Sequence, residues 1–162
     1  MRVYKCSDKT ISQLRGFTLV ELIMVLVVIG VLAAAALPRF WDRQVFDSRG
    51  FYDQTLSVLR YAQKAAIAER RTVCVAFTST TSTTVTLTIA AAAGSSVCGS
   101  NLASPNGASP FIVTAKTGVS FVAVPANFQF NPLGQATIGQ TIQVTNASGN
   151  IIIEQDTGYV HP

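Results

Sequence analysis

The sequence predicts an α+β fold, in which a long N-terminal helix packs against an antiparallel β-sheet domain. Two observations carry this prediction. Residues 17–37, FTLVELIMVLVVIGVLAAAAL, are apolar almost throughout. From Thr72 onward the composition changes to Val, Thr, Ile, Phe, Ser and Gly, and apolar residues recur with a period of two, which is typical of strands with one buried face. The 162 residues suffice for one such helix and one outer domain.

The apolar segment is long enough to cross a bilayer. As a helix it would measure roughly 32 Å, against a hydrocarbon layer of about 30 Å. The preceding 16 residues carry most of the chain's net charge of +4, because their own balance is +3 (Arg2, Lys5, Lys9 and Arg15 against Asp8). The positive-inside rule therefore predicts that residues 1–16 stay in the cytoplasm and that the domain after the span lies across the membrane.

The polar residues at the start of the segment form a specific motif. Glu21 is its one ionisable residue, and a charge inside a span costs roughly 3 kcal/mol or more, so it is normally kept for a partner or a task. The string Gly16-Phe17-Thr18-Leu19-Val20-Glu21-Leu22, continuing through the apolar run to Pro38, resembles the N-terminal signature of type IV pilins and type II secretion pseudopilins.

The resemblance implies how the N-terminus is processed. A prepilin peptidase is expected to cleave between Gly16 and Phe17 at the cytoplasmic face, removing residues 1–16 as a leader, and Phe17 is then expected to be N-methylated. Residues 17–37 would serve first as an anchor in the bacterial inner membrane, with the C-terminal domain in the periplasm. They would later form the core helix of a pilus or pseudopilus filament.

Cleavage also suggests a role for Glu21. It creates a positive amine at Phe17, four residues before Glu21 and about 6 Å away along a helix. When subunits stack with an axial offset, Glu21 of one can approach the amine of its neighbour, and the distance-sensitive attraction in an apolar medium would select the register. The alternative is a carboxylate that reaches the nearby headgroups.

Gly30 and Pro38 predict a weak region in the helix. Proline removes a helical hydrogen bond and favours a kink, and glycine lowers helix propensity. In the family that the motif resembles, the segment between such positions can loosen on assembly, and we expect the same of Gly30 to Pro38 here. The alternative is that Pro38 marks the membrane exit.

Residues 38–71 are predicted to continue the helix outside the membrane, because they are rich in helix formers and mixed in charge. One face is expected to pack on the outer domain, at a spacing of three and four residues (Tyr52, Leu56, Leu59, Gln63, Ala66 and Ile67). The opposite face is expected to be solvated, with four basic residues (Arg60, Lys64, Arg70 and Arg71).

Residues 72–162 are predicted to form the β domain. Val73, Val75 and Phe77 alternate, a Ser/Thr turn follows, and the alternation resumes, as in a hairpin with one buried face. The region from Ala90 to Ala108 is expected to be a loop. Further strands are expected at Phe111–Ala115, Val119–Val124, Phe128–Phe130, Thr141–Thr145 and Asn150–Glu154.

The cysteines predict one disulfide. Of the three, Cys6 belongs to the segment placed in the reducing compartment, whereas Cys74 and Cys98 lie on the oxidising side and can pair. The alternative is that both are small buried hydrophobic residues.

A second, looser resemblance concerns the class of subunit. The helix end YAQKAAIAERRTVCVAF and the chain end FNPLGQAT to IIIEQDTGYVHP are similar to H-type pseudopilins and to FimT-type or MshC-type minor pilins. The resemblance implies a minor subunit, with a major pilin as the nearest alternative. The expected partners are other major and minor pilins or pseudopilins, the prepilin peptidase and N-methyltransferase, the inner-membrane assembly platform, and membrane lipid before assembly.

Catalysis is the least supported class of function. The single histidine, His161, lies in a terminal tail that is a poor scaffold for a nucleophilic site, and no metal-ligand spacing or phosphate-binding loop occurs. We expect no enzyme activity, cofactor or metal. DNA binding, as in some FimT-like minor pilins, is a competing hypothesis. It would use five basic residues, although the outer chain is nearly neutral (Arg60, Lys64, Arg70, Arg71 and Lys116).

Overall fold

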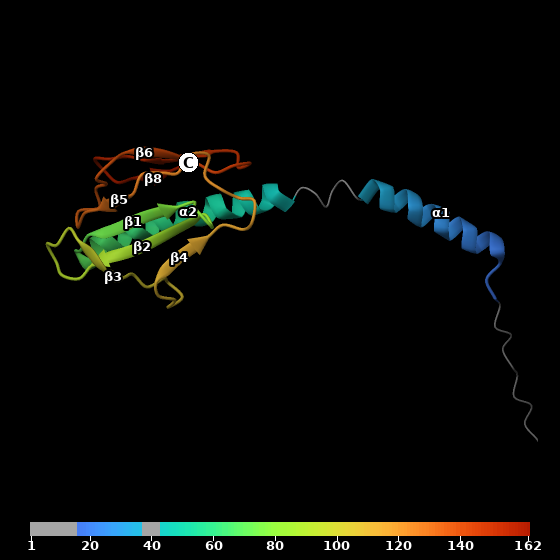
Figure 1. Cartoon of the computed structure of the whole chain (residues 1–162), viewed down its shortest axis with the longest axis horizontal. Coiled ribbons are helices and arrows are strands. Elements are labelled where there is room, and N and C mark those ends of the chain that lie inside the picture. The colour runs from blue at the N-terminus through green and yellow to red at the C-terminus, as the bar shows by residue number, and fades with distance from the viewer. Residues whose placement is uncertain (1–15, 37–42) are drawn as a thin grey trace, which may run out of the picture. The chain divides into compact units, whose positions relative to one another are not determined.

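The computed structural model describes residues 16–36 and 43–162. The chain divides into two compact units, Met1–Trp41 and Asp42–Pro162, which are described separately (Figure 1). Helix α1, Leu19–Ala36, lies in the first unit, and helix α2, Arg43–Glu69, lies in the second. The expected continuity between the two helices falls on residues 37–42, which include Pro38 and lie outside the described residues.

Helix α1 begins at Leu19, later than the sequence predicts. Thr18 ends the preceding segment, and its Oγ1 accepts a hydrogen bond from the Glu21 amide at 3.2 Å. A threonine in this position is a preferred N-cap, which explains why Phe17 stays outside the helix. The helix then continues through Gly30 without interruption. Within the described part of the chain, no helix combines the length and the apolar character that crossing a membrane requires.

The residue that follows helix α2, Arg70, has a left-handed backbone conformation. Arg70 has φ of 53°, its amide donates to Ile67 O at 3.3 Å, and the Arg71 amide donates to Ala66 O at 3.2 Å. These two bonds form a Schellman cap, in which glycine is the usual residue at the position that Arg70 occupies. The cap turns the chain into the first strand of the sheet.

One face of α2 is buried against the sheets. Leu56, Leu59 and Ala66 are buried as expected, whereas Ile67 remains 48% exposed. The buried face also contains two hydroxyl side chains that the pattern did not predict, Ser48 and Thr55. The buried residues of α2 are Ser48, Phe51, Thr55, Leu56, Val58, Leu59, Ala62, Ala65 and Ala66.

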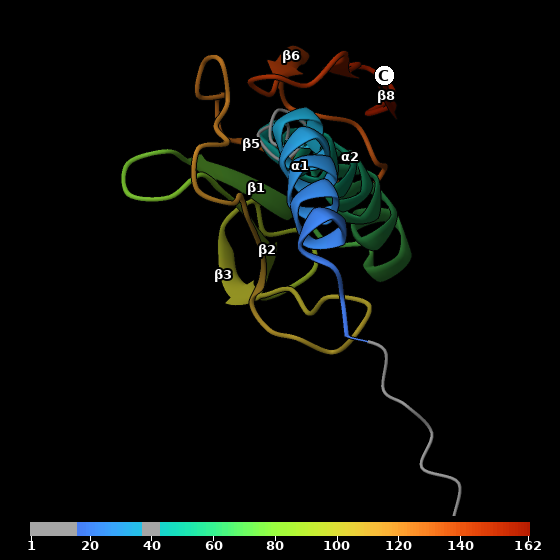
Figure 2. The same cartoon turned by 90° about the vertical axis from the view of Figure 1, so that its right-hand side faces the viewer.

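The larger sheet has five strands and lies against α2. Its strands are β1 Val73–Thr78, β2 Thr84–Ala90, β3 Cys98–Asn101, β4 Phe111–Thr114 and β5 Phe128–Phe130. The order is β3-β2-β1-β5, β4 pairs with β2 beyond the end of β3, and all pairings are antiparallel. Figures 1 and 2 show α2 on one face of β1 and β2.

A smaller antiparallel sheet contributes the rest of the core. Its strands are β6 Gln140–Gln143, β7 Asn150–Ile153 and β8 Val160–His161, in the order β6-β7-β8. Ile142, Ile151 and Val160 point into the same core as the α2 residues. Five phenylalanines link the parts of this core, with neighbouring ring centroids 5.0 to 6.2 Å apart (Phe51, Phe77, Phe121, Phe128 and Phe130).

The strand predictions are confirmed in part. The β1–β2 hairpin is present, in the register Val73↔Ile89 and Phe77↔Val85. The strand predicted at Val119–Val124 is wrong: only an isolated bridge between Phe121 and Val144 forms there. Val119 and Phe121 are buried in the core, whereas Val122 and Val124 are 62% and 56% exposed.

Two strands occur where none was expected. Strand β3 lies inside the predicted loop from Ala90 to Ala108, where it pairs with β2 across a shift in register. Strand β8 occupies the predicted tail, where Val160 pairs with Ile153. In both places pairing with the preceding strand supplies the order that local composition does not.

Candidate functional site

The N-terminal segment exposes apolar side chains in every direction. From Leu19 to Leu32 the large hydrophobic residues of α1 are 46% to 73% exposed, and Glu21 is exposed among them. A helix that is apolar around its whole circumference is typical of one that is covered by lipid or by other protein. The helix α1 therefore has an apolar surface of the kind that lipid or other protein covers.

Glu21 has a structural context that the sequence analysis missed. Thr18 and Glu21 occupy the first and fourth positions of the capping pattern Ser/Thr-x-x-Glu, and the Thr18 hydroxyl accepts from the Glu21 amide. The carboxylate also lies in the first turn of α1, where the helix dipole favours a negative charge. The spacing of the two residues could have revealed this N-cap.

Phe17 precedes the cap and is 81% exposed. In the uncleaved chain it lies outside α1, which begins at Leu19. The four intervening peptide bonds still keep the two residues close in the chain. Their pairing within or between cleaved subunits stays a prediction.

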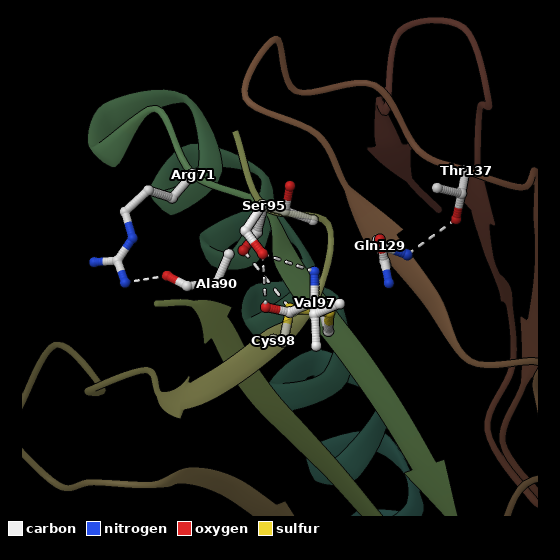
Figure 3. The surroundings of a disulfide bond; sticks show 9 residues. Arg71, Ala90, Ser95, Val97, Cys98, Gln129 and Thr137 are labelled. Carbon is white, nitrogen blue, oxygen red and sulfur yellow. Dashed lines mark hydrogen bonds between the residues drawn. A yellow bond between two sulfur atoms is a disulfide. The ribbon is translucent and has the colours of Figure 1, made fainter. Parts of the chain in front are cut away.

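The outer unit contains the expected disulfide. Cys74 in β1 and Cys98 in β3 are joined across 24 positions of sequence, with Cα atoms 6.1 Å apart. Figure 3 shows its surroundings, in which the Arg71 side chain donates to the carbonyl of Ala90. The disulfide therefore joins β1 and β3, the two strands that lie on either side of β2.

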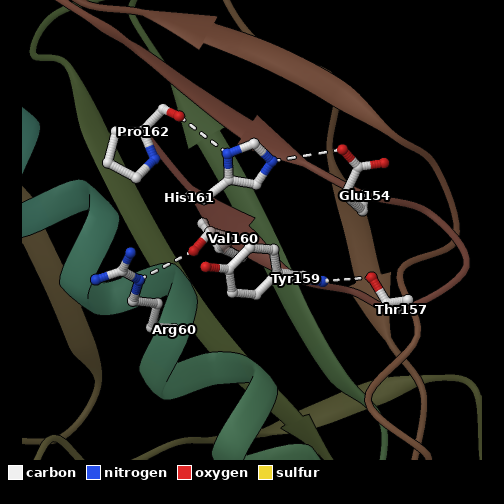
Figure 4. Close-up of polar contacts among 7 residues, drawn as sticks. All are labelled: Arg60, Glu154, Thr157, Tyr159, Val160, His161 and Pro162. Atoms are coloured by element: carbon white, nitrogen blue, oxygen red, sulfur yellow. Dashed lines mark hydrogen bonds and ion pairs between the residues drawn. The ribbon is translucent and has the colours of Figure 1, made fainter.

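The five basic residues considered for DNA binding do not gather in one patch. The Arg60 Nε donates to Val160 O at 3.0 Å (Figure 4), and Arg71 lies 3.5 Å from Glu69. The Lys116 ammonium lies 2.7 Å from Asp47, at the other end of α2. About 35 Å of helix separates Asp47 from Arg70 at 1.5 Å per residue. Lys64 and Arg70 are exposed, and neither lies near Lys116 along the helix.

His161 belongs to a strand and not to a free tail. It pairs with Ile152, its Nε2 lies 3.4 Å from the Glu154 carboxylate, and its ring stacks on Tyr159 at 5.1 Å (Figure 4). Within residues 16–36 and 43–162, no serine or cysteine side chain forms a hydrogen bond with its ring. Among those residues there is also no cluster of three or more His, Cys, Asp or Glu side chains that could hold a metal.

Comparison with known proteins shows what the N-terminal segment is similar to. Residues 12–37 match the prokaryotic N-terminal methylation motif. The chain is 41% identical over 56 residues to the type IV major pilin protein PilA of Myxococcus xanthus (strain DK1622). It is 39% identical over 57 residues to the type IV narrow pilus major component PilA5 of Thermus thermophilus. In this segment the chain is similar to type IV pilins.

These matches cover a limited part of the pilins concerned. Each spans 35% of this chain, and they span 26% of the Myxococcus relative and 49% of the Thermus relative. Among solved structures, the type IV minor pilin FimU of Pseudomonas aeruginosa (strain PAO1) aligns with a TM-score of 0.46 and 16% identity. That alignment covers 69% of this chain and 89% of the other.

Proposed function

We propose that this chain is a structural subunit of a type IV pilus or of a type II secretion pseudopilus, assembled through its N-terminal helix. The observation that carries the proposal is the methylation motif at residues 12–37, together with an α1 that exposes apolar side chains all around. Covering that surface with the α1 helices of other subunits would remove it from water. The role is structural and involves no catalysis.

The proposed processing follows from the motif. Cleavage after Gly16 frees the Phe17 amine, which is then methylated, and the charged amine becomes a partner for Glu21 of a neighbouring subunit. The exposed position of Glu21 in the first turn of α1 supports this pairing, because no side chain of the described residues bonds its carboxylate. Before assembly, residues 17–37 are proposed to be held in the inner membrane with the outer unit in the periplasm. The apolar composition and the basic leader support that placement.

Glu21→Gln tests the proposal, because it keeps the shape of the side chain and removes the charge. We expect the variant to be expressed and processed but to enter filaments much less efficiently than the unchanged chain. Asp53→Asn is the matched control, since Asp53 is exposed on α2, far from α1 in sequence. Equal amounts of Glu21→Gln and unchanged chain in sheared filaments would contradict the register role.

We further propose that the chain is a minor subunit. The second resemblance, at the end of α2 and the chain end, supports this, although the two relatives reported above are described as major pilins. The proportion of the chain in a sheared filament preparation tests it. A small fraction supports a minor subunit, and a dominant band would make it the bulk component.

A further inference from the structure

The peptide bond between Gly16 and Phe17 lies outside helix α1. Both residues and Thr18 precede the helix, which begins at Leu19. The Phe17 side chain is 81% exposed. Among the described residues other than its chain neighbours, none has an atom within 4 Å of the place where a Cβ of Gly16 would stand. The bond between the two residues is therefore accessible.

Two hydrogen bonds of Thr18 set the point at which α1 begins. The Leu22 amide donates to Thr18 O at 3.1 Å, as an amide four residues further along a helix does. The Glu21 amide donates to the Thr18 Oγ1 at 3.2 Å. In a longer helix, the Glu21 amide would donate to the carbonyl of Phe17 instead. The Thr18 hydroxyl thus occupies a donor that a longer helix would need.

Without this cap, a longer helix is favoured over a shorter one. Residues 19–29 contain no Ser, Thr, Asn, Asp or Gly, so this stretch offers no residue that could cap a later start. Amides that lose their partner in apolar surroundings raise the free energy, which disfavours fraying from Leu19 onward. Extension toward the leader supplies them with the carbonyls of Gly16 and Phe17. Loss of the cap should therefore draw the bond between these two residues into the helix.

A bond inside a helix is a poorer target for hydrolysis. In a longer helix the Gly16 carbonyl, whose carbon water attacks, would accept from the Val20 amide. Proteolysis acts on open segments of the chain. Its rate follows the population of the open form when opening is fast compared with cleavage. A cap that keeps the bond out of the helix should therefore raise the rate of cleavage.

We propose that Thr18 is a positioning residue for the removal of the leader, because its cap ends α1 before the bond between Gly16 and Phe17. Hydrolysis breaks that C–N bond, and water supplies the hydroxyl of the new Gly16 carboxyl group and a proton for the Phe17 amine. Thr18 acts through the start of the helix and not on the reacting atoms. The inference rests on the proposed function, in which a prepilin peptidase cleaves after Gly16.

Cleavage of the full chain in detergent by a purified prepilin peptidase tests this role, with intact-protein mass spectrometry following the loss of residues 1–16. Thr18→Val keeps the shape of the side chain and removes the cap, whereas Thr18→Asn changes the shape and keeps the cap. A lost cap changes the helix equilibrium about fivefold. We therefore expect Thr18→Val to be cleaved roughly two- to fivefold more slowly than the unchanged chain. Thr18→Asn and the conservative Thr18→Ser should be cleaved at the unchanged rate.

The two shapes separate capping from direct recognition of the side chain by the peptidase. A peptidase that reads the shape of residue 18 would cleave Thr18→Val faster than Thr18→Asn, and that order would overturn the inference. Equal rates for Thr18→Val and the unchanged chain would overturn it as well. In both cases cleavage after Gly16 in the unchanged chain would still support the proposed processing.

Carbon-13 chemical shifts of Gly16 and Phe17 in detergent micelles give an independent readout of the helix start. We expect helical values in Thr18→Val and non-helical values in the unchanged chain and in Thr18→Asn. A slowly cleaved Thr18→Val in which both residues remain non-helical would refute the inference, because the substitution would then act by direct contact with the peptidase. An unchanged chain that is not cleaved after Gly16 would overturn the proposed processing together with this inference.

Discussion

Thr55 on α2 offers a sharp test of how the core is held together. Its side chain is fully buried, and its Oγ1 has no hydrogen-bond partner in the described structure. A buried hydroxyl without a partner costs roughly 1–3 kcal/mol by protein mutational data. Valine has nearly the same shape and replaces the hydroxyl with a methyl group. We therefore expect Thr55→Val to raise the free energy of unfolding by about 1–2 kcal/mol.

Thr145 provides the matched control, because its hydroxyl is fully used. Its Oγ1 accepts from the Ser120 amide at 3.1 Å and donates to Ser120 O at 3.0 Å. The same substitution, Thr145→Val, should lower the free energy of unfolding by about 1–2 kcal/mol, because it leaves the Ser120 amide without a partner, whereas Ser120 O keeps its bond from the Thr145 amide at 2.9 Å. The two variants should thus shift stability in opposite directions.

Denaturant unfolding of the full chain in mild detergent, followed by the near-ultraviolet circular dichroism of the core aromatic residues, measures both changes. The slope of the transition should be unchanged, so that the midpoint alone reports stability. If Thr55→Val lowered the midpoint as Thr145→Val does, the buried hydroxyl would have a partner that the described contacts lack. That result would refute the reasoning.

Three other predictions concern the disulfide, the end of α2 and the basic residues. Changing Cys74 and Cys98 to Ser should lower the free energy of unfolding by about 3.5 kcal/mol on a chain-entropy estimate for a closed loop of this length, and reductant should have the same effect in thermal scans. Arg70→Gly should raise the free energy of unfolding by about 1 kcal/mol, because the φ of 53° at this position favours glycine. An unchanged midpoint of denaturant unfolding would contradict this prediction. In a gel shift with the full chain, we expect no DNA complex with the steep salt dependence that many phosphate contacts produce. The reason is that Arg60 and Lys116 form their contacts at separate places. A DNA complex that is lost in Arg60→Gln would restore the DNA hypothesis.

Local periodicity was enough to predict the elements that have one buried face. The alternation of Val73, Val75 and Phe77 predicted β1, and all three are buried. The same rule failed at Val119–Val124, where two valines are exposed and Pro125 follows. A strand needs a partner as well as a pattern. This segment meets the end of β6 and the residues after it only through an isolated bridge, Phe121 to Val144, and two neighbouring hydrogen bonds.

Long-range contacts account for what could not be predicted. Strand β8 is held by Arg60 and by pairing with β7, neither of which is visible in the local composition of the chain end. Gln63 likewise bonds Gly134 O and Thr157 O, joining two loops to α2. The N-terminal site was easier to predict, because its motif is contiguous. Even there the Thr18 cap was missed, although the Thr-x-x-Glu spacing was present.

Mass spectrometry of sheared surface filaments tests the central claim most directly. If the chain is a subunit assembled through its N-terminal segment, the filament fraction should contain a peptide that begins at Phe17 and carries one N-terminal methyl group. The membrane fraction should hold the remaining processed chain. Absence of the chain from filaments, with an intact N-terminus upstream of Phe17 in the membrane fraction, would contradict the account.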